Sequence, residues 1–298
     1  MTTFFRCDQL TYFHLMMTLC GSLLGLSLAH NQALSQQKSP NRIVSLSLAS
    51  DETLYELLKK KGELPRLIAV STTSADPKYS YLSHIFHNKT KLKQVPAAIE
   101  DVLRLAPDFV VAAKFNNPKL LRAIKNHKIN HLILDKFSSI NDLINNTHIL
   151  AKAVNAEEQG QELVQLIRDE LKQKSHLSQH SPKKTMLSFS SSLHIMGQNT
   201  LFSDLLHSAG FQNALALPGW PKLTLEFLLK IEPDYIVAPC APKNQNKVFD
   251  YLQTTRGWRE KKSVQTKKII CIEYRALYST SFHIVQALRQ LKAGYKNV

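Results

Sequence analysis

The stretch that decides the fold occurs twice: residues 99–112 read IEDVLRLAPDFVVA, and residues 225–238 read LEFLLKIEPDYIVA. At a constant offset of 126 residues, six of the fourteen positions are identical and six more are conservative. In each copy a short amphipathic helix is predicted to end before Pro-Asp, because the residue before a proline disfavours helical backbone angles. A run of β-branched and aromatic residues follows, which predicts a buried strand.

Weaker similarities flank this repeat. Residues 43–47 (IVSLS) open the first half as residues 186–190 (MLSFS) open the second, and residues 131–135 (HLILD) resemble residues 269–273 (IICIE). Such short apolar runs alternate with helical patterns, which predicts parallel strands joined by crossover helices. We expect an α/β protein with two Rossmann-like lobes, each built on a parallel sheet.

The two lobes are expected over residues 41–138 and 184–298, with the inter-lobe helices in residues 139–175. This middle stretch is no Gly/Ser-rich linker, and its pattern predicts two helices that meet near Asn155. The second spans roughly 28 Å if it is helical to Lys174. A single long helix between the lobes leaves a ligand cleft and permits only modest relative motion.

The first 29 residues read as a cleavable signal peptide. Arg6 precedes an apolar run from residue 15 to residue 28, and the run ends in small residues, so we expect cleavage after Ala29. An uncleaved N-terminal membrane anchor is the alternative. Cys20 lacks the small preceding residue of a lipid-modified cysteine. The mature chain is therefore predicted to be exported to the periplasm.

Composition narrows the function classes. The chain has 298 residues and a formal net charge of +15, with lysines scattered and no nucleic-acid motif, so we expect a solvated basic surface and no nucleic-acid partner. Residues 188–192 are serine-rich but lack the glycines of a nucleophile elbow. With nine glycines in all, no phosphate-binding loop is visible. We expect a binding protein and not an enzyme; a secreted α/β enzyme without a recognisable catalytic motif is the alternative.

Two cysteines, Cys240 and Cys271, remain after the signal peptide. They could pair in an oxidising compartment, or stay as two buried thiols, and the sequence leaves both open. The histidines are dispersed, so a site for a bare metal ion is not expected. A haem ligand among Tyr79, Tyr81 and His87 has no support in the pattern.

Taken together, these features resemble the helical-backbone (class III) substrate-binding proteins of ABC importers for iron–siderophore complexes, haem and cobalamin. The resemblance rests on residues 42–46 (RIVSL), on Val95-Pro96 with Glu100 and the following LAPD, and on residues 218–237. It implies a monomeric periplasmic protein that captures a metal chelate, an iron–siderophore or cobalamin, and delivers it to a permease dimer in the inner membrane. A haem-binding protein of the same class is the alternative. The chain would need no cofactor of its own, while its ligand would contain iron or cobalt.

In that family, one glutamate at the tip of each lobe pairs with arginines of the permease, and the matching positions here are Glu100 and Glu226. The competing explanation is helix chemistry, since Thr224 can cap a helix whose first turn holds Glu226. The first copy has Ala98 at the position of Thr224. Capping alone therefore does not explain both glutamates.

Ligand-binding candidates come from the carboxyl ends of the expected strands, where ligands of open α/β sheets lie. An aromatic side chain offers a flat apolar face, and an arginine could hold an anionic group. Ordinary packing is the alternative for the aromatic residues. The candidates are Ser47, Lys114, Phe115, Trp220, Tyr274 and Arg275.

Overall fold

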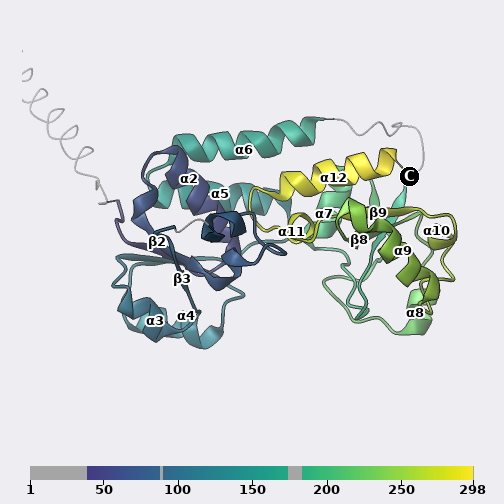
Figure 1. The fold of residues 1–298 in the computed structure, drawn as a ribbon, viewed down its shortest axis with the longest axis horizontal. Coiled ribbons are helices and arrows are strands. Elements are labelled where there is room, and N and C mark those ends of the chain that lie inside the picture. Colours follow the sequence, from purple (N-terminus) through teal and green to yellow (C-terminus); the bar gives the residue numbers. More distant parts are fainter. Residues whose placement is uncertain (1–38, 88–89, 174–182, 298) are drawn as a thin grey trace, which may run out of the picture. The chain divides into compact units, whose positions relative to one another are not determined.

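The computed structural model describes residues 39–87, 90–173 and 183–297, and from Pro40 onward the chain forms one compact unit (Figure 1). The expected signal peptide and its cleavage site lie outside the described residues. Over the described ranges, no helix is both long and apolar enough to cross a membrane.

The first half contains a five-stranded parallel sheet in the order β3-β2-β1-β4-β5. Its strands are β1 (Ile43–Ser45), β2 (Leu67–Ser71), β3 (Lys93–Val95), β4 (Phe109–Ala113) and β5 (His131–Leu134). Its helices are α2 (Leu48–Lys60), α3 (Ile99–Arg104) and α4 (Pro118–Asn126), with short 3-10 turns η1 (Leu64–Arg66), η2 (Thr72–Ala75) and η3 (Ser83–His87).

Both faces of this sheet are covered, which is why its strands are apolar without alternation. In β4, Phe109 and Val111 belong to the core beneath α2, while Val110 and Ala112 belong to the core beneath α3 and α4. Successive side chains of a strand point to opposite faces, so a continuous apolar run is what two covered faces require.

The second half repeats the plan with a four-stranded parallel sheet in the order β7-β6-β8-β9. Its strands are β6 (Thr185–Ser188), β7 (Gln212–Asn213), β8 (Tyr235–Pro239) and β9 (Ile269–Ile272). Its helices are α7 (Leu201–Ser208), α8 (Leu225–Leu229), α9 (Gln245–Thr254), α10 (Lys262–Gln265), α11 (Tyr274–Leu277) and α12 (Ile284–Lys296), with η4 (Pro242–Asn244). The fold class predicted from the repeat is thus confirmed.

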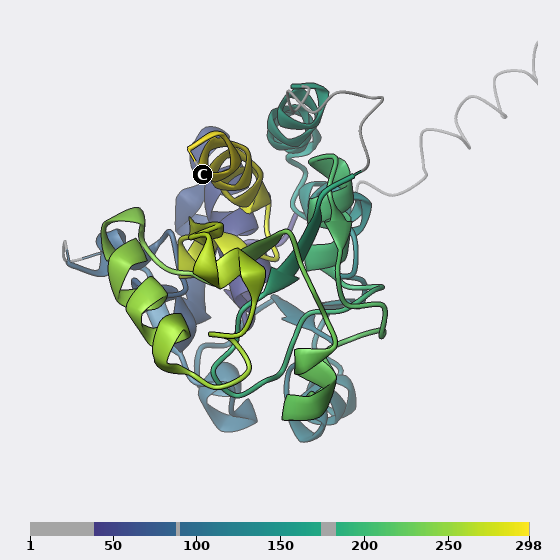
Figure 2. The ribbon, with the colours of Figure 1, turned by 90° about the vertical axis from the view of Figure 1, so that its right-hand side faces the viewer.

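The order β7-β6-β8-β9 corresponds to β2-β1-β4-β5, so the sequence repeat is a repeat of sheet topology. Residues of α7 and α12 share a core with one face of the second sheet, and residues of α8, α9 and α10 share a core with the other (Figure 2). The repeat helices α3 and α8 stop short of the predicted Pro-Asp, at Arg104 and Leu229.

The aspartate of each Pro-Asp ties together the starts of two neighbouring strands. Asp108 accepts hydrogen bonds from the backbone N–H groups of Asn41 and Arg42, both at 2.8 Å, just before β1. Asp234 accepts from the N–H of Thr185 at 2.8 Å, at the start of β6. Asp108 and Asp234 therefore have the same structural role in both lobes.

Two helices, α5 (Ile140–Ala153) and α6 (Glu157–Lys172), lie between the sheets in the sequence. The chain turns between them at Asn155, whose φ is 55°. The 16 residues of α6 span about 24 Å, shorter than expected because the helix ends at Lys172.

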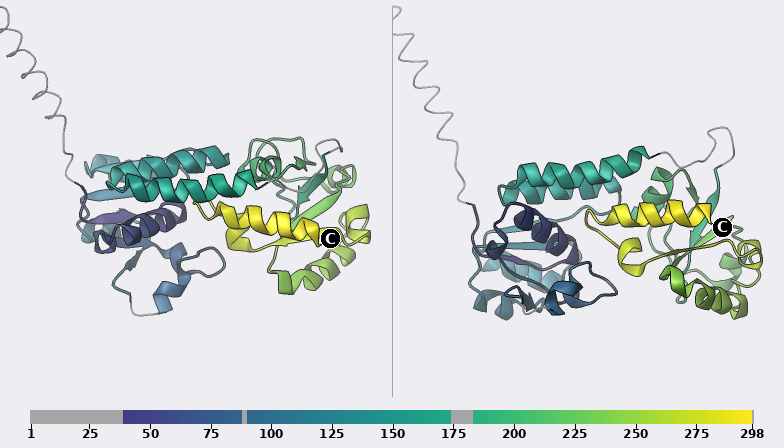
Figure 3. Two further views of the ribbon diagram at one scale, coloured as in Figure 1. Left: turned by 90° about the horizontal axis from the view of Figure 1, so that it is seen from above. Right: turned by 45° about the horizontal axis from the view of Figure 1, so that its top comes forward.

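Helices α6 and α12 lie side by side (Figure 3). Glu170 of α6, with only 1% of its side chain exposed, pairs with Arg289 at 2.8 Å and Lys292 at 3.1 Å on α12. Removing one partner of a buried pair is costly, because it leaves a charge uncompensated. These ion pairs therefore fasten the C-terminal helix to the inter-lobe helix.

Cys240 and Cys271 form a disulfide, which resolves the alternative that the sequence left open. Cys271 lies in β9, and Cys240 directly follows β8; their Cα atoms are 5.0 Å apart. The bridge joins two hydrogen-bonded neighbouring strands at their carboxyl ends.

Candidate ligand-binding site

A pocket of about 310 Å³ lies where loops from the carboxyl ends of the two sheets meet. The first half contributes Phe115 after β4 and Phe137 and Ser138 after β5, and the second half contributes the remaining lining. Those remaining residues are Met196, Asn199, Thr200, Leu201, Phe202, Gly219, Trp220, Leu277, Tyr278 and Thr280. The pocket has the position that ligands take in open α/β sheets.

Trp220 provides an exposed aromatic surface in this pocket. Its residue is 51% exposed, and its ring stacks on Tyr278 with centroids 6.0 Å apart. Tyr278 packs on Tyr274 at 4.4 Å, and Tyr274 meets Tyr79 edge-on at 5.2 Å. We call these four side chains the aromatic row; it runs from the second half of the chain to the first.

Phe115 provides a second exposed ring, from the first half. It is 58% exposed and lies 5.1 Å from the ring of Phe137. Exposed aromatic residues from both halves therefore contribute to one pocket, and leaving such rings exposed costs free energy unless something covers them.

The pocket is uncharged. Its described lining residues include no lysine, arginine, histidine, aspartate or glutamate, and the polar groups are hydroxyls and the Asn199 amide. Burial, with smaller effects of Tyr274 and Tyr79, raises the pKa of Tyr278 to about 12, so its hydroxyl stays neutral near pH 7. The lining therefore favours a ligand face that is apolar and hydrogen-bonding over one with several charges.

The other sequence-predicted ligand residues lie outside the lining. Arg275 pairs with Glu273 at 3.1 Å, and its guanidinium lies 4.5 Å from the Tyr81 ring centroid. Lys114 is exposed beside Phe115. Ser47 is 3% exposed and caps α2, with its hydroxyl 2.7 Å from that of Ser50.

Sequence reasoning missed two important pocket residues, Tyr278 and Phe137. Phe137 follows the end of β5 by three residues, so the rule that selected Phe115 could have selected it. Tyr278 lies four residues after Tyr274, which is the spacing of helical neighbours. Its contact with Trp220, however, depends on the tertiary structure.

A buried contact between the two halves lies near the aromatic row. The Glu52 carboxylate, on α2, accepts a hydrogen bond at 2.9 Å from the N–H of Tyr81 and one at 2.6 Å from the Ser281 hydroxyl, 229 residues away in the chain. The Tyr81 ring stacks on His283 with centroids 4.1 Å apart. Segments far apart in sequence are thus joined through polar and aromatic groups.

Burial shifts the pKa values of the titratable groups at and beside this contact. It raises the pKa of Glu52 to about 7, against hydrogen bonds from Ser281 and Tyr81 that lower it. Burial likewise raises the pKa of neighbouring Asp51 to about 7. Burial, together with the Arg275 guanidinium, lowers the pKa of His283 to about 4, so His283 is neutral near pH 7.

The described residues contain no group of three or more His, Cys, Asp or Glu side chains that could hold a metal ion. Of the haem-ligand candidates, Tyr79 is the one in the aromatic row. The hydroxyl of Tyr81 is buried without a hydrogen-bond partner, and burial raises its pKa.

Glu100 and Glu226 are both exposed, on the short helices α3 and α8. The Thr224 hydroxyl caps α8 by accepting a hydrogen bond from the N–H of Phe227 at 3.2 Å, whereas Ala98 gives α3 no side-chain cap. The cap of α8 therefore needs only the Thr224 hydroxyl and no contribution from Glu226, and the carboxylates of Glu100 and Glu226 are exposed to solvent.

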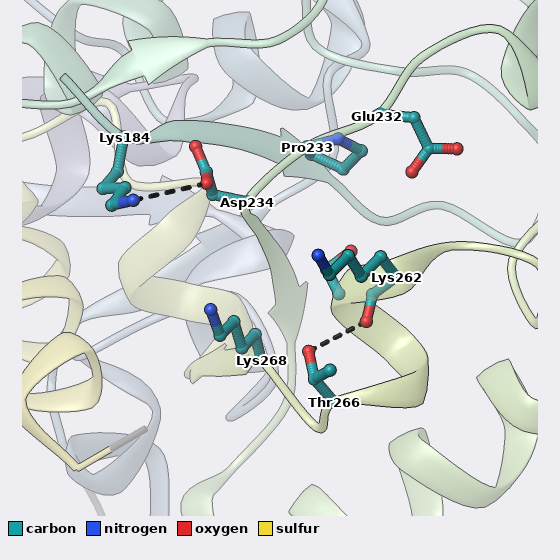
Figure 4. Close-up of a pocket in the computed structure, with 8 residues that line it drawn as sticks. Lys184, Glu232, Pro233, Asp234, Lys262, Thr266 and Lys268 are labelled. Carbon is teal, nitrogen blue, oxygen red and sulfur yellow. Dashed lines mark hydrogen bonds and ion pairs between the residues drawn. The ribbon is translucent and has the colours of Figure 1, made fainter. Parts of the chain in front are cut away.

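A second hollow, of about 350 Å³, lies at the opposite, amino-terminal edge of the second sheet (Figure 4). It is lined by Lys184, Lys262 and Lys268 together with Glu232 and Asp234. Lys184 pairs with Asp234 at 3.6 Å (Figure 4), and the fully buried Lys261 lies 3.5 Å from Glu232. Although burial opposes ionisation of Asp234, hydrogen bonds from Thr185 and the Lys184 charge lower its pKa below the ordinary value. Much of this charge is therefore paired within the chain.

Two α/β lobes with an uncharged pocket at the carboxyl ends of their sheets define a binding protein. The chain belongs to the periplasmic binding protein family, whose pattern it matches over residues 43–276. It is an ABC transporter substrate-binding protein and not an enzyme. Proteins of this family are transport components that work outside the cytoplasm.

One curated relative and two solved structures illustrate this similarity. The chain is 23% identical over 273 residues to YvrC of Bacillus subtilis, described as an uncharacterized ABC transporter substrate-binding lipoprotein; the match covers 88% of this chain and 82% of YvrC. The periplasmic heme-binding protein RhuT of Roseiflexus sp. RS-1 is 19% identical with a TM-score of 0.68, over 86% of this chain and 98% of RhuT. The periplasmic vitamin B12 binding protein BtuF of Vibrio cholerae is 19% identical with a TM-score of 0.66, over 87% and 98%. At this identity, the two structures show a common fold.

Proposed function

We propose that this chain captures an uncharged metal chelate, cobalamin or a neutral iron–siderophore complex, and delivers it to the permease of an ABC importer. The observation that carries the proposal is the pocket lining: exposed Trp220 and Phe115 from the two halves, with hydroxyl and amide groups and no charged side chain. Rings of this kind suit the apolar face of a macrocycle or chelate.

Charge distinguishes the ligands within this class. A ferric catecholate carries several negative charges, and such a group in an uncharged pocket would lose hydration without gaining ion pairs. Cobalamin presents neutral amides around its ring, and a ferric hydroxamate can be neutral overall. With a volume near the lower end of ligand pockets, the pocket would hold one face of the chelate rather than the whole molecule.

Haem is the second candidate, and the aromatic row favours it. Tyrosine is one of the axial ligands that proteins offer to haem iron, and Tyr79 and Tyr274 lie together in the row. The Lys78 ammonium lies 4.4 Å from the Tyr274 ring centroid, where it could also meet a propionate.

A titration panel tests the ligand proposal. Of the chain's two tryptophans, Trp258 is fully buried and Trp220 lies in the pocket, so Trp258→Phe leaves a single reporter at the site. We expect cyanocobalamin or ferrichrome to quench this variant and to release heat in calorimetry, and ferric enterobactin to do neither. A Soret shift with haem, without binding of the two neutral chelates, would favour the second candidate. No response to any member would refute the chelate proposal.

Delivery is proposed to use Glu100 and Glu226, exposed on equivalent helices of the two lobes. Such carboxylates can meet basic groups on two halves of a permease, each surface pair contributing about 1 kcal/mol and fixing orientation. We expect Glu100→Ala/Glu226→Ala to weaken docking by about thirtyfold and to lower uptake accordingly, while the titration above is unchanged. An equal loss of ligand affinity would mean that these residues are not docking residues.

The proposed site of action is the periplasm, reached through the signal peptide expected in residues 1–29. An N-terminal membrane anchor would leave the binding lobes in the same compartment. Release of the protein by osmotic shock, against retention in the membrane fraction, separates the two.

A further inference from the structure

The identical positions of the repeat divide into two groups. Six residue pairs are identical between residues 99–112 and 225–238, and four of them have structural roles within the chain. The valine and alanine pairs are fully buried in β4 and β8, the aspartates tie neighbouring strands, and each proline follows the end of its helix.

The two remaining pairs are Glu100 with Glu226 and Leu103 with Leu229. Both glutamates are exposed, and the two leucines share the same exposure, 37% each. Between them on each helix lies a fully buried residue, Val102 or Leu228, which anchors the helix to its sheet. Packing therefore explains the anchors, whereas neither the exposed glutamates nor the exposed part of the leucines has a role inside the chain.

Residues three apart on a helix are neighbours on its surface, so each glutamate and its leucine form one outward patch. Figure 1 shows α3 and α8 along the same lower side of the described structure. Two equal patches on equivalent helices are what a partner with two equivalent halves would select.

We propose that Leu103 and Leu229 are apolar docking residues that insert beside Glu100 and Glu226 into the two halves of the permease. This inference rests on the proposed delivery function and adds to it an apolar contact at each tip. The partner surface would present, in each half, a basic side chain next to an apolar socket. An exposed carboxylate alone steers and orients, whereas a leucine covered by the partner adds affinity by removing apolar surface from water.

The patches also differ in one position. Asp101, next to Glu100, pairs with Arg104 at 3.0 Å, whereas its counterpart Phe227 is 40% exposed. The tip of the second lobe thus offers more apolar surface. We expect Leu229 and its surroundings to contribute more to docking than Leu103.

Photo-crosslinking in the host membrane tests the contact without knowledge of the transported ligand. Benzoylphenylalanine is introduced in the full chain at position 103, 229, 100 or 226, and at Leu166 as a control, since Leu166 is 45% exposed on α6. We expect adducts from 103 and 229 with one integral ABC permease polypeptide and none from 166. Adducts from 100 and 226 without any from 103 and 229 would overturn the leucine inference and leave the docking proposal standing. Absence of adducts at all four positions would overturn both.

Affinity for the purified permease in nanodiscs provides the second readout. Covering on the order of 60 Å² of each leucine predicts about a tenfold weaker complex for each Leu→Ser change. This loss should persist at high salt, whereas the loss from Glu100→Ala/Glu226→Ala should shrink there, because salt screens exposed charges. Leu166→Ser should bind as the unchanged protein does. Leucine variants that unfold at the usual temperature yet bind normally would refute the inference.

Discussion

Glu52 is one of two neighbouring buried carboxyl groups, with Asp51, that are expected to make the stability of this protein depend on pH. Its residue is 2% exposed, and its hydrogen bonds to Tyr81 and Ser281 join the two halves of the chain. In the unfolded chain this carboxyl group ionises near its ordinary pKa of 4.5, whereas in the folded chain it ionises at about 7. Between these values the unfolded chain has released a proton that the folded chain still holds, so raising the pH through this window favours unfolding.

The expected magnitude follows from the difference in pKa. At about 1.4 kcal/mol for each pH unit, the wild-type protein should lose about 3 kcal/mol of unfolding free energy between pH 4.5 and pH 7 through Glu52. Glu52→Gln removes this loss, while its amide can still accept from the Tyr81 N–H and donate to the Ser281 hydroxyl. The variant should therefore gain stability relative to wild type as the pH rises, and the gain should level off above pH 7.

Urea unfolding followed by circular dichroism, at fixed ionic strength and at several pH values from 4.5 to 8, measures this difference. Asp51 is present in both proteins, so the difference between variant and wild type reports Glu52 together with its electrostatic interaction with Asp51. Glu158→Gln, an exposed change on α6, is the matched control and should show no pH-dependent difference. A difference for Glu52→Gln that stays flat, or that falls as the pH rises, would refute the reasoning.

Three further changes test other parts of the structure. Trp220→Ala should weaken binding of the chelate found in the titration panel by ten- to a hundredfold, as measured by calorimetry. Tyr251→Ala is the control, because Tyr251 is also an exposed aromatic residue but lies outside the pocket lining, and it should leave the affinity unchanged. Equal losses of affinity in the two variants would contradict the proposed pocket. Cys240→Ser/Cys271→Ser removes a disulfide between residues 31 apart in the chain, and it should lower the unfolding free energy by about 3–4 kcal/mol in denaturant melts. Ligand affinity should be retained. An unchanged melt would show that the disulfide adds no stability. Asp108→Ala should cost about 1–3 kcal/mol in the same melts, because the N–H groups of Asn41 and Arg42 lose hydrogen bonds to a carboxylate that ties β1 to β4. A loss below the error of the melts would argue against the structural role of Asp108.

Much of the site could be predicted in outline, because ligand pockets of α/β proteins form at the carboxyl ends of strands. That rule selected Phe115 and Trp220, which line the pocket, and Tyr274, which lies in the aromatic row. It also selected Arg275, whose guanidinium is engaged by Glu273 and Tyr81. The rule locates the end of a strand and says nothing about which neighbour a long side chain will contact.

The sequence by itself determined the two-lobed α/β architecture. Short apolar runs and amphipathic helices have periodicities that local backbone geometry imposes, and the repeat at offset 126 required the same unit twice. Contacts between distant segments cannot be derived from these helix and strand periodicities. Only the tertiary structure decided that Cys240 meets Cys271, that Trp220 stacks on Tyr278, and that Ser281 reaches the buried Glu52. The first two contacts depend on how strands and loops pack within the second lobe, and the third depends on how the two halves of the chain meet. Packing of this kind is a property of the whole chain.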